Sequence, residues 1–268
     1  MLLIADTRLD LHTILEEFAS GGLTLSEVKK EIAIHAVEQL DNIAKLDVNR
    51  EIRRGGTPEI IFSESKEYKD IIKIATAIVR RNGQVIISRI KKGELSRVAG
   101  TLRRKGLSVE IGRNSTTMLA SEKSFAYKMA DAKIGIMSAG TSDIGVAEEA
   151  RIVSKAMGCE AITSYDIGVA GIHRIFPALK DMFKQEIGAI VVVAGMEGAL
   201  ASVVASMVDI PVVGVPTSIG YGFGAKGIGA LASMLQSCTL GLAVVNIDNG
   251  IGAGAYAAMI AKRTTNRK

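Results

Sequence analysis

The sequence contains few aromatic residues and few cysteines. Tryptophan is absent, and phenylalanine, tyrosine and tryptophan together make up 4% of the 268 residues. Two cysteines, Cys159 and Cys238, are too few for a disulfide framework in a chain of this size, and they form no CxxC pair. Apolar residues nevertheless reach 48% of the chain, so the core must consist largely of aliphatic side chains. Such a core suits parallel strands covered by helices, in one large or two ordinary domains.

We expect neither a membrane span nor a secretion signal in this sequence. No run of about 18 apolar residues is free of charge, because Glu197 and Asp209 interrupt the richest stretch. The N-terminus MLLIADTRLDLH has no basic segment followed by an apolar one, so we expect a cytoplasmic protein without a signal peptide. The net charge is +5, but residues 133–260 have few basic side chains. The excess of positive charge is typical of a solvated face, and an anionic small-molecule substrate is the alternative. We expect neither nucleic acid nor membrane as a partner.

The first part of the chain, residues 1–128, is predicted to combine a helical segment with a small α/β lobe. Helical periodicity covers residues 10–19 and 24–49. The next predicted elements are the strand EIIFS, a helix near 66–81, the strand QVIIS, a helix near 93–104 and the strand SVEI. This order predicts a small βαβαβ unit. A polar segment at about 121–132 is expected to join it to the rest of the chain.

The second part, residues 129–268, has a longer alternation of strands and helices. Five strands are predicted, KIGIMS, EAITS, AIVVVA, IPVVGV and LAVVNI, each separated from the next by a helix. This pattern predicts an α/β fold with a doubly wound parallel sheet, a three-layer αβα domain. Open sheets of this kind bind ligands at turns that follow the carboxyl ends of strands. We expect one of these turns to carry Cys238.

Three short motifs in the turns have both a structural and a functional interpretation. GIGAGA at 250–255 can bind a dinucleotide or serve tight packing, and it lacks the acidic partner that follows a dinucleotide motif about 20 residues later. Asp143, in TSD, can cap the next helix or accept hydrogen bonds from ribose hydroxyls. Glu197 can stabilise a helix N-terminus or act as an acid or base with a raised pKa.

The order of turns in residues 133–260 resembles the purine-biosynthesis carboxylase that acts on aminoimidazole ribonucleotide. Ser142 and Asp143 match the last two positions of that family's Gly-Ser-x-Ser-Asp motif. AGMEGALAS stands where the family has an AGGAAHLPG-type loop. The family's catalytic histidine falls at Ala199, so the chain departs from the family at that position.

Longer strings resemble the LarB family, the carboxylase/hydrolase of nickel-pincer nucleotide cofactor synthesis. These strings are KLDVNREIRRGGTPEIIF (45–62), YDIGVAGIHR (165–174), AGMEGAL (194–200), GVPTSIGYG (214–222) and VVNIDNGIGAG (244–254). The resemblance implies carboxylation of nicotinic acid adenine dinucleotide at pyridinium C5 and cleavage of its phosphoanhydride to release AMP. The implied product is pyridinium-3,5-biscarboxylic acid mononucleotide, on the route to the cofactor of lactate racemase.

The resemblance and the residue types together predict the site residues. Cys238 matches the family's nucleophile, although free cysteines are also often small buried hydrophobic residues. A thiolate is a soft nucleophile and a good leaving group, so it can add to the ring and depart again. We expect Cys238, Glu197 and Asp143 to be catalytic. The expected substrate-binding residues are Gly140, Thr141, Ser142, His173, Arg174, Gly195, Met196, Ser218, Gly220, Tyr221, Asp248, Asn249 and Gly250.

The expected ligands and partners follow partly from the same resemblance and partly from the residue types. The expected co-substrate is carbon dioxide or bicarbonate, and no covalently bound cofactor is expected. Asp143, Glu197 or Asp248 is a candidate ligand of Mg²⁺ at the phosphoanhydride. The related carboxylase fold implies a homo-oligomer, an octamer. A basic cluster is either a solvated face or a contact to the adenylate, and consists of Lys45, Arg50, Arg53 and Arg54. The alternatives are a purine-pathway carboxylase or mutase and a nucleotide-binding regulator without turnover.

Overall fold

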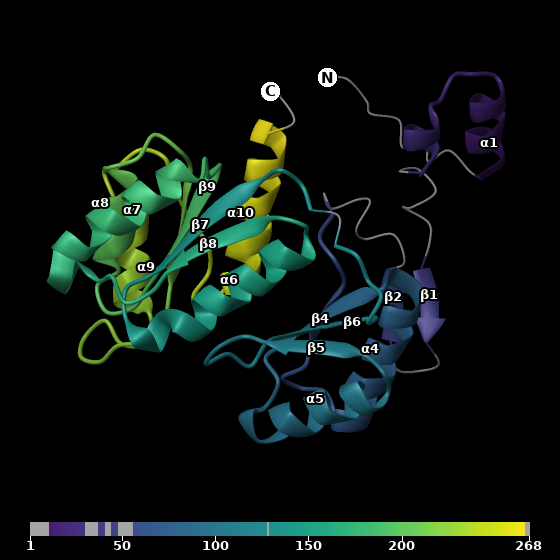
Figure 1. Cartoon of the computed structure of the whole chain (residues 1–268), viewed down its shortest axis with the longest axis horizontal. Helices are drawn as coiled ribbons and strands as arrows, with labels where there is room; N and C mark the ends of the chain where they lie inside the picture. Colours follow the sequence, from purple (N-terminus) through teal and green to yellow (C-terminus); the bar gives the residue numbers. More distant parts are fainter. Residues whose placement is uncertain (1–10, 30–36, 41–43, 48–55, 128, 266–268) are drawn as a thin grey trace, which may run out of the picture. The chain divides into compact units, whose positions relative to one another are not determined.

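The computed structural model describes residues 11–29, 37–40, 44–47, 56–127 and 129–265. The chain forms two compact units, residues 1–59 and 60–268, and the second unit contains both of the larger sheets (Figure 1). Among the described residues, no helix is both long enough and apolar enough to cross a membrane.

The first unit contains a helix and a two-stranded hairpin. Helix α1 (Leu11–Ala19) confirms the helix predicted at 10–19. Of the helix predicted over 24–49, residues 25–29 are helical. The prediction is wrong for the residues of strands β1 (Val37–Leu40) and β2 (Ala44–Asp47), which pair antiparallel. Asp41 and Asn42, residue types that favour turns, separate the two strands in the sequence. Of the predicted basic cluster, Lys45 lies in β2, and Arg50, Arg53 and Arg54 lie outside the described residues.

The second unit begins with a small four-stranded sheet in the order β3-β4-β6-β5. Its elements are β3 (Ile60–Phe62), α4 (Tyr68–Asn82), β4 (Gln84–Ser88), η1 (Lys92–Glu94), α5 (Leu95–Arg104), β5 (Ser108–Ile111) and β6 (Met118–Ser121). The three predicted strands and both helices are present. The predicted βαβαβ order from β3 to β5 is confirmed, but the prediction missed a fourth strand of this sheet, β6. It lies between β4 and β5 and runs antiparallel to both.

The large sheet is entirely parallel, with the order β11-β10-β9-β7-β8. Its elements are β7 (Lys133–Ser138), η2 (Thr141–Asp143), α6 (Ile144–Ala156), β8 (Glu160–Ser164), η3 (Val169–Arg174), α7 (Ile175–Lys184), β9 (Ala189–Ala194), α8 (Ala199–Ala205), β10 (Val212–Pro216), α9 (Ile228–Leu235), β11 (Leu242–Val244) and α10 (Gly250–Thr265). All five predicted strands are confirmed, and the fold class is α/β as expected.

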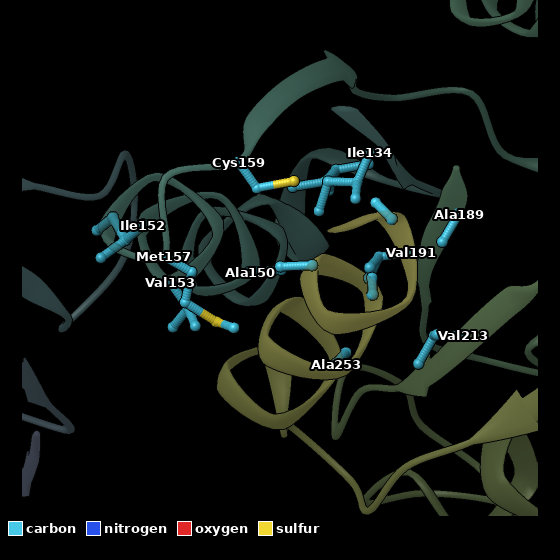
Figure 2. Packing of buried hydrophobic residues seen from close by; sticks show 14 of the residues in the cluster. Ile134, Ala150, Ile152, Val153, Met157, Cys159, Ala189, Val191, Val213 and Ala253 are labelled. Atoms are coloured by element: carbon cyan, nitrogen blue, oxygen red, sulfur yellow. The ribbon is translucent and has the colours of Figure 1, made fainter. Parts of the chain in front are cut away.

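Successive residues of each strand point to opposite faces of the sheet and contribute to two hydrophobic cores. Ile134, Val191 and Val213 point toward one face, where they pack with residues of α6 and α10 such as Ala150 and Ala253 (Figure 2). The intervening strand residues pack on the other face with α7, α8 and α9. This two-residue alternation is what a strand covered by helices on both faces requires. The sheet is therefore the middle layer of a three-layer domain.

The glycines of GIGAGA bring α10 close to α6. A Cβ added to Gly254 would lie 2.5 Å from the carbonyl oxygen of Ala150, and one added to Gly250 would lie 2.1 Å from that of Val146. Real Cβ atoms do not approach so closely, and any larger residue would push the helices apart. The packing interpretation of this motif therefore has direct structural support, although the contact is between two helices.

Candidate active site at the carboxyl edge of the sheet

The strand order changes direction between β7 and β9. The chain moves from β7 to β8 on one side, then returns past β7 to β9, β10 and β11 on the other. In open α/β sheets, ligands bind outside the carboxyl ends of the strands at such a switch point. The loops after β7, β9, β10 and β11 meet there. They contain most of the residues predicted to bind substrate.

Asp143 connects three of these loops through hydrogen bonds. Its side chain is 4% exposed, and its carboxylate accepts hydrogen bonds from Thr217 Oγ1 at 2.7 Å and from the Gly140 backbone N–H at 2.9 Å. The Gly195 backbone N–H donates to it as well. Burial raises the pKa of Asp143, and the charge of Asp248 adds to this effect, while the three hydrogen bonds oppose it. The carboxylate makes no cap hydrogen bond to α6, and its bond from the Gly140 N–H caps the short helix η2 instead.

The turn after β9 presents Met196 and Glu197 to solvent. Met196 has a φ of +52°, and its N–H donates to the Ile219 carbonyl oxygen at 2.9 Å. A Cβ on Gly195 would lie 2.3 Å from that same oxygen, so only glycine fits at that position. Gly220 packs against Met196 from the opposite loop. The exposed carboxylate of Glu197 therefore projects from a tightly fixed turn.

Asp248 connects the ends of β10 and β11. Its carboxylate accepts the Ser218 N–H at 2.8 Å, and its own N–H donates to the Pro216 carbonyl oxygen at 2.9 Å. Its φ is +55°, an uncommon value for a residue other than glycine. The next residue, Asn249, accepts the Gly252 N–H at 2.9 Å and so caps α10. Tyr221, in the loop after β10, is 81% exposed.

The loop after β8 lies at the same edge of the sheet. Arg174 forms an ion pair with Asp166 at 3.3 Å, and the Asp166 N–H donates to Ser138 Oγ at the end of β7. His173 is exposed. Thr141 and Ser142, in the turn after β7, are exposed too. The structure therefore brings the predicted residues of all five loops to one edge.

Cys238 does not lie at that edge. It is exposed, and it precedes β11, whose residue Leu242 pairs with the first residue of β10. Gly241 accepts the N–H of Val212, which starts β10. Because the strands are parallel, these contacts put Cys238 at the amino edge. The expectation that its turn follows a strand is wrong, because this turn joins the end of α9 to the start of β11.

A hollow of about 990 Å³ also lies at the amino edge. Its lining includes Lys133, Lys184, Asp209, Pro211 and Thr264, and none of the predicted site residues. Among the described residues, no group of three or more histidine, cysteine, aspartate or glutamate side chains could hold a metal ion.

The sequence analysis missed Glu149 and its neighbours. Glu149 is 8% exposed, accepts a hydrogen bond from Thr117 Oγ1 at 3.0 Å, and accepts another from the Ile251 N–H at the start of α10. Burial raises its pKa to about 7, although the nearby charge of Arg89 opposes this effect. The helical spacing of the sequence could have indicated that Glu149 is buried, because it lies on the same face of α6 as the apolar residues Ile152 and Ala156.

Comparisons with known proteins agree with this architecture. Residues 37–122 match the family model of the LarB/PurE-like N-terminal domain, and residues 133–267 match that of AIR carboxylase. The chain belongs to the LarB family. An uncharacterized protein of Methanocaldococcus jannaschii is 45% identical over 94% of this chain and 97% of its own length. The N5-carboxyaminoimidazole ribonucleotide mutase of Thermotoga maritima is 31% identical over 48% of this chain and 74% of its own length.

Membership of the LarB family assigns the chain to a carboxylase-type activity. The AIR carboxylase match covers the parallel sheet and all five loops of the carboxyl edge. The N-terminal match covers the small sheet, which supplies Thr117 and Arg89. The part that matches the N-terminal model therefore supplies Arg89 and Thr117, which contact Asp248 and Glu149 in the part that matches AIR carboxylase.

Proposed function

We propose that this LarB-family protein carboxylates pyridinium C5 of nicotinic acid adenine dinucleotide and hydrolyses its phosphoanhydride. The products are pyridinium-3,5-biscarboxylic acid mononucleotide and AMP. The main support is that the chain has one exposed thiol, Cys238, while Ala199 occupies the position of the purine family's histidine. Cys159 is 1% exposed, and burial raises its pKa to about 11, which leaves its thiol protonated at neutral pH.

The chemistry requires a reversible covalent adduct. A pyridinium ring is electron-poor, so its C5 cannot attack carbon dioxide directly. Addition of the Cys238 thiolate at C4 or C6 makes C5 an enamine carbon, and its electron pair then forms the new C–C bond. Loss of the C5 proton and departure of the thiolate restore the aromatic ring. No oxidant or reductant is consumed.

The carboxyl edge offers groups for the remaining steps. Glu197, exposed on its fixed turn, is the proposed acceptor of the C5 proton. Asp143 holds the loops after β7, β9 and β10 in position, and its burial suits a carboxyl group that exchanges a proton. Water attacks the phosphoanhydride and releases AMP. Mg²⁺ stays a prediction at this step, and its ligands would include the phosphate oxygens of the substrate.

Cys238 lies at the edge of the sheet opposite the other proposed catalytic groups. The carboxyl and amino edges are separated by the five residues of β10, about 17 Å at 3.3 Å per residue. We infer that the thiol reaches the carboxyl edge of a neighbouring subunit in a homo-oligomer, for which an octamer is the expectation. Exposed apolar side chains suit such an assembly. They include Tyr221, Phe223, Ile228, Leu235 and Leu240.

The decisive experiment compares Cys238→Ser with Cys159→Ser. Each variant is incubated with nicotinic acid adenine dinucleotide and labelled bicarbonate, and the products are weighed by mass spectrometry. Cys238→Ser should abolish C–C bond formation, because an alkoxide is a poor leaving group, while dinucleotide affinity is retained. Cys159→Ser should keep most of the activity. Carboxylation by Cys238→Ser near the wild-type rate would exclude the covalent mechanism.

Two alternatives are tested by the same assay. A purine-pathway mutase would instead convert N5-carboxyaminoimidazole ribonucleotide, as the name of the Thermotoga maritima relative states. A nucleotide-binding regulator would bind the dinucleotide and release neither AMP nor a carboxylated product. Ala199 disfavours the first alternative, since the purine family's chemistry depends on a histidine there.

A further inference from the structure

Arg89 links the small sheet to the carboxyl edge of the large one. It is the first residue after β4, and its guanidinium Nη2 donates to the Asp248 carbonyl oxygen at 3.4 Å. The guanidinium carbon also lies 5.8 Å from the ring centroid of Phe62, at the end of β3. The Arg89 side chain therefore contacts both Phe62 of the small sheet and the loop that carries Asp248.

The backbone of Arg89 is held in an unusual conformation. Its φ of +52° lies in the left-handed region, which costs free energy for a residue with a Cβ. The adjacent hydrogen bond from the Ile90 N–H to the Thr116 carbonyl oxygen fixes the chain just beyond it. The fold thus aims this arginine at the edge.

The charge of Arg89 lowers the pKa of the nearby Glu149 without a direct ion pair between the two side chains. The Arg89 side chain is exposed, and within the described part of the chain no carboxylate forms an ion pair with it. Among the described residues, its one side-chain hydrogen bond, to the Asp248 carbonyl oxygen, is long at 3.4 Å, so these residues leave most of its N–H donors available. By contrast, Arg174 at the same edge is already paired with Asp166.

An anionic ligand needs such a cation here. Asp143, Glu149 and Asp248 give the edge several carboxyl groups, which repel a phosphate. The N-terminus of α10 does not compensate, because its Ile251 and Gly252 N–H groups already donate to Glu149 and Asn249. A planar guanidinium with free donors binds phosphate through two parallel hydrogen bonds.

We propose that Arg89 is a substrate-binding residue through which the small lobe holds a phosphate group at the carboxyl edge of β11. The inference rests on the proposed function for the identity of the nucleotide, and on the contacts of Arg89 for the phosphate. It gives the N-terminal family domain a role in selecting phosphorylated over unphosphorylated pyridines.

Calorimetric titration of the full-length protein tests this role with two probes, inorganic pyrophosphate and nicotinic acid adenine dinucleotide. Arg89→Gln should weaken both by about tenfold or more, because a charged hydrogen-bonding partner is lost. The dependence of affinity on ionic strength should become shallower as well. Arg89→Lys, which keeps the charge but loses the planar fork, should fall between Arg89→Gln and the wild type.

Arg97→Gln is the matched control. Arg97 is an exposed arginine of the same lobe, with its guanidinium carbon 4.0 Å from the ring centroid of Tyr68, and we expect its loss to leave both affinities unchanged. Wild-type affinity of Arg89→Gln for both probes would overturn the inference. So would a loss of turnover at unchanged affinity, or a wild-type protein that does not bind pyrophosphate. Arg89-dependent pyrophosphate binding without any carboxylated product would instead reject only the proposed function.

Discussion

The position of Cys238 predicts how mixtures of two inactive variants behave. Cys238 precedes β11 at the amino edge, while Glu197 follows β9 at the carboxyl edge. If the thiol of one subunit serves the site of another, Cys238→Ser and Glu197→Gln complement each other. In a random assembly of equal amounts, about a quarter of the sites combine an intact Glu197 with an intact thiol from a neighbour. If both groups act within one subunit, no intact site forms.

The assay uses co-expressed variants with different tags, isolated as mixed assemblies by two affinity steps. Carboxylated product per subunit is measured by mass spectrometry, with each homogeneous variant as the background. Wild type mixed with the double variant is the matched control, and it should retain about a quarter of the sites for a shared site but about half for a site within one subunit. A mixture of single variants at background activity, with half activity in the control, would refute the shared site.

Two further predictions concern the free energy of unfolding, measured by urea denaturation. Gly254→Ala should lower the free energy of unfolding by about 1–3 kcal/mol, because the new Cβ would clash with Ala150. Gly100→Ala in α5 is the control. Its Cβ would lie 3.6 Å from the nearest atom of Arg104, an ordinary contact, so it should raise the free energy of unfolding by about 0.5–1 kcal/mol. Burial raises the pKa of Glu149 from 4.5 to about 7, so the folded state binds the proton more tightly and stability falls as pH rises through this window. Glu149→Gln should remove roughly 3 kcal/mol of this pH dependence, and an unchanged slope would contradict the burial argument.

The large domain was predictable because its strands are short, apolar and separated by helices of ordinary length. AIVVVA is buried at every position of β9, which is the pattern of a central parallel strand. The turns that follow these strands were also recognisable from their glycine and polar residues. The residues expected after β7, β9, β10 and β11 therefore meet at one edge, as the general rule for such sheets requires.

The small lobe was less predictable because its pairing depends on contacts between distant residues. MLAS forms β6 only because Ala120 lies opposite Val85 of β4 on one side and Val109 of β5 on the other. The four residues of β6 alone do not indicate that they form a strand between β4 and β5. The apolar spacing of 24–49 likewise fits a helix, although a hairpin forms at 37–47.

Glu149 and Arg89 show a different limit of sequence reasoning. Each lies outside the turns of the large sheet, on a helix face and at the end of a strand in the other sheet, so no local motif connects them. In the folded protein both lie near Asp248. Glu149 accepts a hydrogen bond from the Ile251 N–H and is affected by the charge of Asp248, and Arg89 donates a hydrogen bond to the Asp248 carbonyl oxygen. Only the packing of the small sheet on α6 creates this neighbourhood, and packing between distant segments is not encoded in short strings.

Whether a turn follows or precedes a strand decides which edge of a parallel sheet it occupies. SCTLG precedes LAVVNID, so the order of the letters alone assigns Cys238 to the edge opposite Asp248, which follows the same strand. Resemblance to a family indicates that two residues act together, but it does not indicate that they belong to one chain. When a family's reactive groups fall on opposite edges of one sheet, the economical explanation is a site shared between subunits. The amino edge of this sheet then becomes as important for catalysis as the carboxyl edge.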